Sequence, residues 1–435
     1  MVKWLDEVPE GNDEKKGRKF SHYSMANILM QGLFLFLCQG ESRNQMNNRA
    51  RFGDFMKENF CRLFPGMHWA HFDTVDVVLQ GITMERLEEV KNRMLREMIK
   101  KKRISTTYGY YTIAVDATGV TTYDQNPGGN LLRRKSSSGR RQYLNYILEA
   151  KIVTAEGLSL SICSEPLTNK HRTIYDKQDC ELKAFIRLAA KLHKAFPRLP
   201  ICLLMDGLYP NQTVFECCKI YGWEYIITLK DGNLPNLQEA ISDTEERLRK
   251  RYTRVVVVNK GQKGKKYGTA KYQWIEGLEH KGYKLNYLEC FWPGVALEDG
   301  TEVPATRFGY VTSLTPRHQG LCHDQVIFKM AEFGRWRWKI ENQGFNTQKN
   351  QGYHLQHKFK RRAVPTLHVY YMLLQIAHLI NQVVIHSQEV AALLRASPKL
   401  THKFLWEKMR SVLDMCRLST DRLAENERRC QIRLE

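Results

Sequence analysis

This 435-residue sequence lacks the motifs of several common protein classes. It has no Gly-x-Ser-x-Gly elbow and no glycine loop ending in Gly-Lys-Ser/Thr, which argues against ordinary hydrolases and ATP-driven enzymes. Its eleven cysteines are scattered without a Cys-x-x-Cys pair, so we expect reduced thiols rather than a disulfide framework. The N-terminus is charged and polar, so no signal peptide is expected. The longest apolar run, Gly32–Cys38, is far too short to span a bilayer.

Negative charge is also in short supply. The chain has 67 lysines and arginines against 46 aspartates and glutamates, a formal net charge of +21 at pH 7. Such an excess favours a polyanionic partner, above all nucleic acid. An anionic membrane is the alternative, but no basic amphipathic anchor stands apart from the rest of the sequence. The hydrophobic content of 43% is ordinary for a folded protein, and the length predicts two or three domains.

The first hundred residues are predicted to be helical. Apolar residues between Met25 and Leu37 recur at helix spacing. Met84–Lys101 has acidic residues early and basic residues late, which suits the helix dipole. The region could be a structural or dimerising bundle, or a site-specific DNA-binding unit, and no clear helix-turn-helix decides between the two.

A β-rich pattern begins after Ile104. The elements expected from it alternate between strands and helices, and the first strand is apolar on both faces, as in the centre of a sheet. In order they are strand, strand, strand, helix, strand, helix and strand: Tyr108–Val115, Tyr143–Val153, Leu158–Cys163, Asp179–His193, Ile201–Met205, Asn211–Tyr221 and Glu224–Leu229. This order implies an α/β fold with a mixed sheet and helices on its faces, in which the first and fourth strands can lie side by side.

The later chain divides into three parts. Four strand-like segments between Lys230 and Thr315 predict a β-rich insertion. Beyond it, His323–Phe333 and Arg335–Phe345 are predicted helices separated near Gly334. Pro365 then opens a strongly apolar helix, which nevertheless carries too many polar residues for a membrane span. Residues 398–434 are expected to form one or two charged amphipathic helices.

A long basic loop is expected between the first two core strands. Its serines and glycine indicate flexibility, and its charge indicates phosphate contact. A solvated, disordered loop fits the same residues equally well. The candidate DNA-binding residues in it are Arg133, Arg134, Lys135, Arg140 and Arg141.

Three acidic residues are candidates for a common site. Asp116 and Asp206 each close an apolar strand, and either alone could be an ordinary turn residue. If their strands are adjacent, both carboxylates emerge where open α/β sheets bind ligands. Glu341 lies four residues after Arg337, so the two share a helix face. Taken alone, that pair could be a simple exposed salt bridge.

Carboxylate oxygens suit Mg²⁺ or Mn²⁺. Two such ions about 3.5–4 Å apart can support an in-line displacement at phosphorus. Arg337, Lys339 and Lys349 could then hold phosphates nearby. A zinc site built from Cys322, His323, His354 and His357 is a weaker alternative, because two of these residues are adjacent and no fourth ligand position is convincing.

Three stretches together resemble the DDE transposases of bacterial insertion sequences, in the class with an RNase-H-like core and a β-rich insertion before the last acidic residue. The resemblance covers roughly Tyr108 to Asn381. It is carried by Ile113-Ala-Val-Asp116-Ala-Thr-Gly, by Leu203-Leu-Met-Asp206-Gly-Leu-Tyr with Asp179-Cys-Glu-Leu-Lys-Ala-Phe upstream, and by Trp338-Lys-Ile-Glu341-Asn-Gln-Gly-Phe-Asn-Thr-Gln-Lys-Asn-Gln-Gly-Tyr-His-Leu-Gln-His357.

The resemblance implies that Asp116, Asp206 and Glu341 bind two Mg²⁺ ions, with Mn²⁺ able to substitute. It implies cleavage of double-stranded DNA at transposon ends and strand transfer into target DNA. It also implies a homodimer in the synaptic complex and a cytoplasmic, nucleoid-associated enzyme that does not act at a membrane. Related enzymes carry a Tyr seven before the Glu, an Arg four before and a Lys seven after. This sequence has Gly334, Arg337 and Gln348 there, with a lysine one place later.

The domains implied are a helical DNA-binding or dimerisation region (1–104), an RNase-H-like core (105–230 and 316–390), the β-rich insertion (231–315) and a helical tail (391–435). Two alternatives remain open. One is a catalytically silent DNA-binding protein derived from a transposase. The presence of all three acidic residues argues against it. The other is a metal-dependent DNA nuclease, against which the β-rich insertion and the basic flanks argue.

Overall fold

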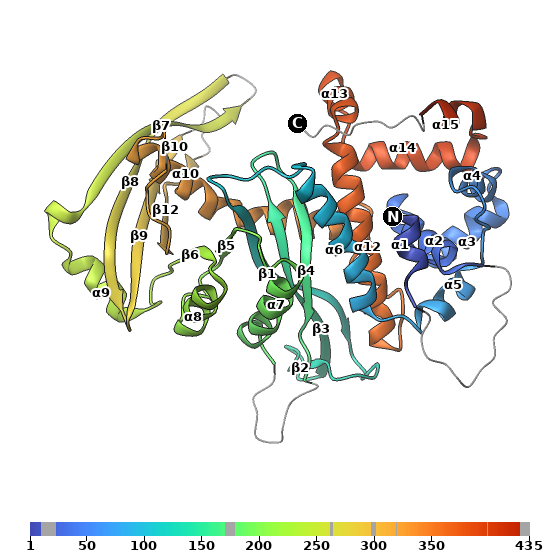
Figure 1. The fold of residues 1–435 in the computed structure, drawn as a ribbon, viewed down its shortest axis with the longest axis horizontal. Helices are drawn as coiled ribbons and strands as arrows, with labels where there is room; N and C mark the ends of the chain where they lie inside the picture. The colour runs from blue at the N-terminus through green and yellow to red at the C-terminus, as the bar shows by residue number, and fades with distance from the viewer. Residues whose placement is uncertain are drawn as a thin grey trace.

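Strands β1 and β5 lie side by side and parallel in the middle of a mixed sheet, as the order of predicted elements suggested (Figure 1). The computed structural model describes residues 1–9, 23–169, 179–261, 264–296, 302–318, 320–397 and 399–426. Parts of the expected N-terminal region (10–22) and of the expected C-terminal tail (427–435) lie outside these residues.

The sheet has ten strands in the order β2-β3-β1-β5-β6-β12-β9-β8-β7, with β4 paired to β3. Strands β1, β5 and β6 run parallel, and the other neighbouring pairs are antiparallel. The fold is therefore mixed α/β, as predicted. The strands that lie in the first part of the chain are β1 (Tyr111–Tyr123), β2 (Leu132–Lys135), β3 (Arg141–Val153), β4 (Ser159–Pro166), β5 (Ile201–Met205) and β6 (Glu224–Thr228).

The segment expected to be an insertion continues this same sheet. Strand β12 pairs with β6 through Tyr310, Val311 and Thr312, so the four long antiparallel strands extend the sheet on the left of Figure 1. The elements of this segment are α9 (Pro235–Asp243), η1 (Glu246–Leu248), β7 (Lys250–Gly261), β8 (Gly264–His280), β9 (Tyr283–Trp292), β10 (Val295–Ala296), β11 (Glu302–Val303) and β12 (Thr306–Thr312).

Helices cover both faces of the central strands. Alternate residues of β1 and β5 point to opposite sides, because side chains in a strand alternate. Ile113 and Leu203 pack with α7 (Glu181–Ala195) and α8 (Gln212–Tyr221). Ala114 and Leu204 pack on the other side with α10 (His323–Trp336). Asp116 continues this alternation on the α10 side, whereas Asp206 follows just beyond the end of β5.

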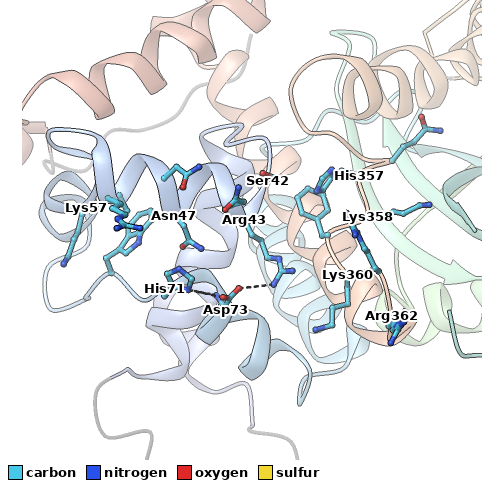
Figure 2. Close-up of a pocket in the computed structure, with 18 residues that line it drawn as sticks. Ser42, Arg43, Asn47, Lys57, His71, Asp73, His357, Lys358, Lys360 and Arg362 are labelled. Carbon is cyan, nitrogen blue, oxygen red and sulfur yellow. Dashed lines mark hydrogen bonds and ion pairs between the residues drawn. The ribbon is translucent and has the colours of Figure 1, made fainter.

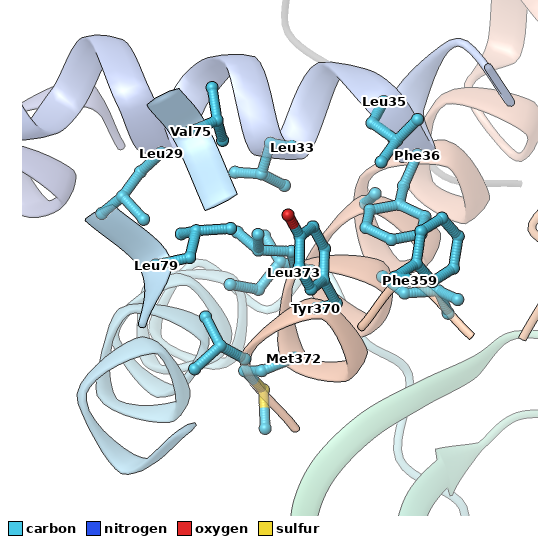
Figure 3. Packing of buried hydrophobic residues seen from close by; sticks show 14 of the residues in the cluster. Leu29, Leu33, Leu35, Phe36, Val75, Leu79, Phe359, Tyr370, Met372 and Leu373 are labelled. Carbon is cyan, nitrogen blue, oxygen red and sulfur yellow. The ribbon is translucent and has the colours of Figure 1, made fainter. Parts of the chain in front are cut away.

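A helical region built from both ends of the chain lies to the right in Figure 1. Its centre is α12 (Val364–Ile385), which packs against α2, α6 and strand β4, while α6 also contacts β4 directly. Figure 3 shows Leu29, Leu33, Val75 and Leu79 packed around Leu373 of α12. The other helices are α1 (Val2–Asp6), α2 (Met25–Leu37), α3 (Arg43–Phe52), α4 (Met56–Leu63), α5 (Phe72–Leu79), α6 (Met84–Lys100), α13 (Gln388–Ala396), α14 (His402–Met415) and α15 (Thr420–Asn426).

By length and composition alone, α12 is apolar enough to cross a membrane, and it is the one such helix in the described part of the chain. In this fold, however, 72% of its most apolar window is buried against other elements. Such burial is what the core helix of a folded domain shows.

Two local expectations were wrong. The stretch Leu132–Arg141 is not a long loop, because β2 pairs with the start of β3 and only Ser136–Arg140 turns between them. The helix break near Gly334 is also absent, since α10 runs unbroken to Trp336. A Cβ at Gly334 would overlap the ring of Tyr310 on β12. This glycine therefore allows the helix to approach the sheet closely rather than ending the helix.

We expect Gly334→Ala to destabilise the protein by about 1–3 kcal/mol, the usual cost of overpacking. The same change in an unobstructed helix would stabilise it by about 1 kcal/mol. Urea unfolding measures the difference. In a Tyr310→Ala background the cost of Gly334→Ala should shrink or vanish, and an equal cost in both backgrounds would show that the ring is not the obstacle.

Candidate active site

The parallel pairing of β1 with β5 sets the first two candidate residues at the same level. The last described pair is Ala114 with Leu204, so Asp116 and Asp206 each follow two residues later. Asp206 lies just beyond the end of β5, as expected. Asp116 differs, because β1 continues to Tyr123 and Asp116 pairs with Glu149 of β3. It lies where β1 loses its parallel neighbour, which leaves its side chain 24% exposed.

The Asp206 side chain forms a turn at the end of its strand. One carboxylate oxygen accepts a hydrogen bond from the Leu208 amide at 2.9 Å. The other lies 3.3 Å from the ammonium of Lys230, which follows β6. Asp206 is therefore an ordinary turn residue and also lies level with Asp116.

Glu341 reaches the sheet through an irregular helix. After α10 the chain forms a π-helix, η2 (Ile340–Asn346), and then the short α11 (Thr347–Asn350). Ile340 and Phe345 are buried in the core beside the sheet. A Cβ on Gly344 would lie 3.1 Å from the Ser159 hydroxyl, so glycine permits this close approach. π-helical turns are rare and often occur at functional sites.

The Arg337 guanidinium joins two of the three predicted carboxylates. It donates to Glu341 at 2.7 Å, which realises the pair expected from their spacing, and lies 3.7 Å from Asp116. Arg337 is only 7% exposed, and its guanidinium also lies 4.6 Å from the ring centroid of Trp338. Residues distant in sequence therefore share one buried cation.

A fourth carboxylate, Glu181, belongs to the same cluster. It opens α7, and Tyr209, just after β5, donates its hydroxyl to it at 3.3 Å. Burial raises the pKa of Glu181, and the nearby Asp206 adds to this rise against the opposing Tyr209 bond. Glu181 was not among the predicted residues. A signal was available, because a helix leading into a parallel strand starts at the edge where that strand ends.

Burial raises the pKa of Asp116 to about 7. The negative charge of Glu341 raises it as well, whereas Arg337 and the Ala117 amide lower it. The ionised Asp116 carboxylate is therefore poorly solvated and lies near other negative charges. Arg337 alone does not offset the free-energy cost of this environment. Such a site favours either a proton or an additional cation.

Two of the three predicted phosphate-binding residues near Glu341 adjoin the carboxylates, and one does not. Besides Arg337, Lys349 is close enough for Asp116 and Glu341 to raise its pKa, although burial lowers it more. Lys339 points elsewhere: it donates to the carbonyls of Thr154 and Ala155 in the β3–β4 turn and stacks on Trp336. This ammonium is committed to a structural role.

The π-helix affects which residue of α11 lies near the carboxylates. A π turn closes i→i+5 hydrogen bonds, one residue more than an α turn, so later residues shift by one position around the axis. Gln348 is fully buried and bonds to Gln375 of α12 at 2.9 Å. Lys349 takes the place near the carboxylates instead.

The remaining basic candidates lie on the β2–β3 hairpin, at the bottom of the sheet in Figure 1. Arg133, Arg134, Lys135, Arg140 and Arg141 are all exposed. Arg133 lies over the Tyr143 ring and Arg134 bonds to Gln142 at 3.1 Å, both across the hairpin. The candidates therefore form two groups, one at the carboxylates and one on this hairpin.

The described residues include no group of three or more His, Cys, Asp or Glu side chains that could hold one metal ion as they stand. The donor chemistry nevertheless fits Mg²⁺, which proteins usually bind through one or two carboxylates together with substrate phosphates. Asp116 and Glu341 already share a cation, Arg337, between them.

Comparison with known proteins gives little further guidance. No family model matches the chain, and no curated protein matches it. Among solved structures, 99% of the chain aligns with 79% of a chain in a cryo-EM structure of the piggyBac transposase synaptic complex with hairpin DNA, at 11% identity and a TM-score of 0.43. At these values the likeness identifies neither a family nor an activity. It does not support the bacterial insertion-sequence origin that the sequence resemblance implies.

We expect the stability of the wild type to fall relative to Asp116→Asn as pH rises from about 4 to about 7. The pKa of Asp116 is raised in the folded chain, so the folded state keeps a proton that the unfolded chain has lost. At pH 8 the variant should gain on the order of 2 kcal/mol over the wild type. Urea unfolding at several pH values measures this, and parallel stability curves would contradict the burial of an ionised Asp116.

Proposed function

We propose that this protein is a metal-dependent DNA transposase that cleaves DNA at the ends of a mobile element and joins the freed 3′-hydroxyl to target DNA. One observation carries the proposal: Arg337 contacts both Asp116 and Glu341, while Asp206 lies level with Asp116 on the neighbouring strand. The net charge of +21 favours a nucleic-acid substrate for such a carboxylate cluster. We take the central strands with their helices as an RNase-H-like core.

Asp116, Asp206 and Glu341 would hold the ions in this proposal, with Glu181 as a further carboxylate at their side. Bound Mg²⁺ or Mn²⁺ would activate the attacking hydroxyl and stabilise the leaving oxygen of an in-line displacement. Because the pKa of Asp116 is raised to about 7, its carboxyl must lose a proton before it can serve as a ligand. Metal affinity should therefore increase with pH around neutrality.

Arg337 and Lys349 would bind the substrate rather than the metal. In the structure, the Arg337 guanidinium balances part of the negative charge of Asp116 and Glu341. With a divalent ion bound to these carboxylates, the guanidinium would be free to hold two oxygens of one phosphate. Lys349, whose pKa is lowered by burial, lies near the same carboxylates and supplies a second phosphate contact. Tyr209 keeps Glu181 in place through its hydroxyl.

We expect Asp116→Asn, Asp206→Asn and Glu341→Gln each to reduce strand cleavage by about 100-fold or more while leaving DNA binding nearly unchanged. The assay uses DNA that carries the sequences flanking the gene, with and without Mg²⁺, and scores cleavage and joining on gels. Glu239→Gln, an exposed change on α9, is the matched control.

The outcomes separate the candidate functions. Wild-type strand transfer by any of the three variants would refute the site. Metal-dependent cleavage without joining would favour a nuclease. Binding without chemistry in the wild type would favour a silent DNA-binding protein descended from a transposase.

We expect Arg337→Gln to tighten Mn²⁺ binding in the absence of DNA by about 10-fold, equivalent to about 1.4 kcal/mol, because the metal no longer competes with an internal cation. Strand cleavage should fall in the same variant, since a phosphate contact is lost. Calorimetric titration measures the affinity. Arg335→Gln is the control, because that guanidinium stacks on Trp292 at 4.3 Å. Unchanged or weaker Mn²⁺ binding by Arg337→Gln would show that the cation site lies elsewhere.

A further inference from the structure

A wide groove separates the N-terminal helices from the chain segment that precedes α12, and Figure 2 shows its two walls. One wall consists of α3, Lys57 of α4 and the start of α5. The other wall is the irregular segment 356–362. The cavity volume is about 1420 Å³. This groove contains none of the carboxylates of the candidate active site.

Positive charge dominates the lining. Seven of the lining residues are lysine or arginine, and Asp73 is the one acidic residue among them: Arg43, Arg51, Lys57, Lys358, Lys360, Arg361 and Arg362 are the basic ones. Within the described part of the chain, no carboxylate forms an ion pair with Lys57, Arg361 or Arg362. The pKa of His357 is lowered by burial and further by neighbouring positive groups. Unpaired charge of one sign across a groove favours a polyanion.

A buried carboxylate fixes the distance between the walls. Asp76 of α5 is 5% exposed, forms an ion pair with Arg43 of α3 at 3.1 Å and accepts a hydrogen bond from Lys360 of the opposite wall at 2.5 Å. Tyr370 of α12 donates to the same carboxylate at 3.1 Å. Arg43 and Lys360 thus hold the groove open at a set width, and the other basic residues remain available to a ligand.

The exposed face of α3 carries side chains of a particular kind. The helix has the sequence Arg-Asn-Gln-Met-Asn-Asn-Arg-Ala-Arg-Phe, with no acidic residue and with Met46 as its one buried residue. Asn44, Asn48 and Arg51 are exposed at spacings of four and three, so they follow one stripe of the helix. The structure describes no hydrogen bond from the side chains of Asn44 or Asn48. An ordinary solvated helix face would mix acidic and basic residues.

Amide and guanidinium groups are the ones that read base edges. Asn and Gln pair with adenine, and Arg pairs with guanine, in the major groove of B-form DNA. That groove is about 12 Å wide and admits an α-helix of about 10–12 Å diameter. The major groove of an A-form RNA duplex is too deep and narrow for this. The chemistry of the groove therefore fits double-stranded DNA better than RNA.

We propose that α3 enters the major groove of double-stranded DNA and reads bases through Asn44, Asn48 and Arg51. Lys57 on one side and Lys358, Arg361 and Arg362 on the other hold the phosphates that flank the contacted bases. The inference does not rest on the proposed catalysis, because sequence-selective binding needs neither metal nor cleavage.

The test uses the full chain in the presence of EDTA, so that failure of the catalytic proposal cannot affect it. A preferred sequence is first selected from a library of random duplexes about 20 base pairs long, two helical turns. Binding to the selected duplex and to a random duplex is then measured by fluorescence anisotropy at several salt concentrations.

Two groove variants should lose DNA binding in different ways. Lys358→Ala/Arg361→Ala should weaken binding of both duplexes about 10-fold or more and lower the slope of log affinity against log salt by about 2. Asn44→Ala/Asn48→Ala should lose about 10-fold or more on the selected duplex alone, leaving random binding unchanged. The control Lys194→Ala/Arg198→Ala removes the same charge from exposed positions far from the groove, and should match the wild type.

All the substituted side chains are exposed, so the variants should keep the unfolding temperature of the wild type. An equal loss in the control would mean that charge alone matters and would overturn the assignment. Wild-type affinity in both groove variants would do the same, as would failure to select a sequence. Tighter binding of duplex RNA than of duplex DNA would overturn the B-form assignment.

Discussion

The hydrogen bonds of Gln375 hold the candidate site together. Its side-chain oxygen accepts from the buried ammonium of Lys151 on β3 at 2.8 Å and from Gln348 of α11 at 2.9 Å. Burial lowers the pKa of Lys151 to about 8, so this ammonium depends on its few partners. Through these bonds α12 links β3 to α11, which directly follows the π-helix that carries Glu341.

Buried ion pairs make the helical region and the sheet a single body. Glu88 of α6 accepts from Lys91 at 3.4 Å and from Lys191 of α7 at 3.1 Å, while its carboxylate also receives the Ser164 amide of β4 at 2.8 Å. These groups are poorly solvated, so removing one member would leave a buried charge unpaired. The basic groove and the carboxylate cluster are therefore held in a fixed spatial relation by α6 and α12.

The sequence predicted local features well and long-range ones only where topology rules applied. Apolar runs placed the start of β1 and all of β5, and the order of elements placed these strands side by side, but the predicted end of β1 at Asp116 was wrong because β1 continues to Tyr123. The hairpin at Leu132–Arg141 was missed because its pairing with β3 outweighs a composition typical of loops. Glu181 was missed because its place depends on where α7 packs, and the π-helix has no propensity signal that would reveal it.

The interactions of Asp76 with both walls affect which DNA duplex the groove would bind. Walls joined through one buried carboxylate cannot spread to suit an ill-fitting partner without breaking bonds to Arg43, Lys360 and Tyr370. The deformation then falls on the double helix, whose stiffness varies with base composition and is lowest at pyrimidine–purine steps. Flexibility of the ligand, at positions that no side chain touches, becomes part of the selection.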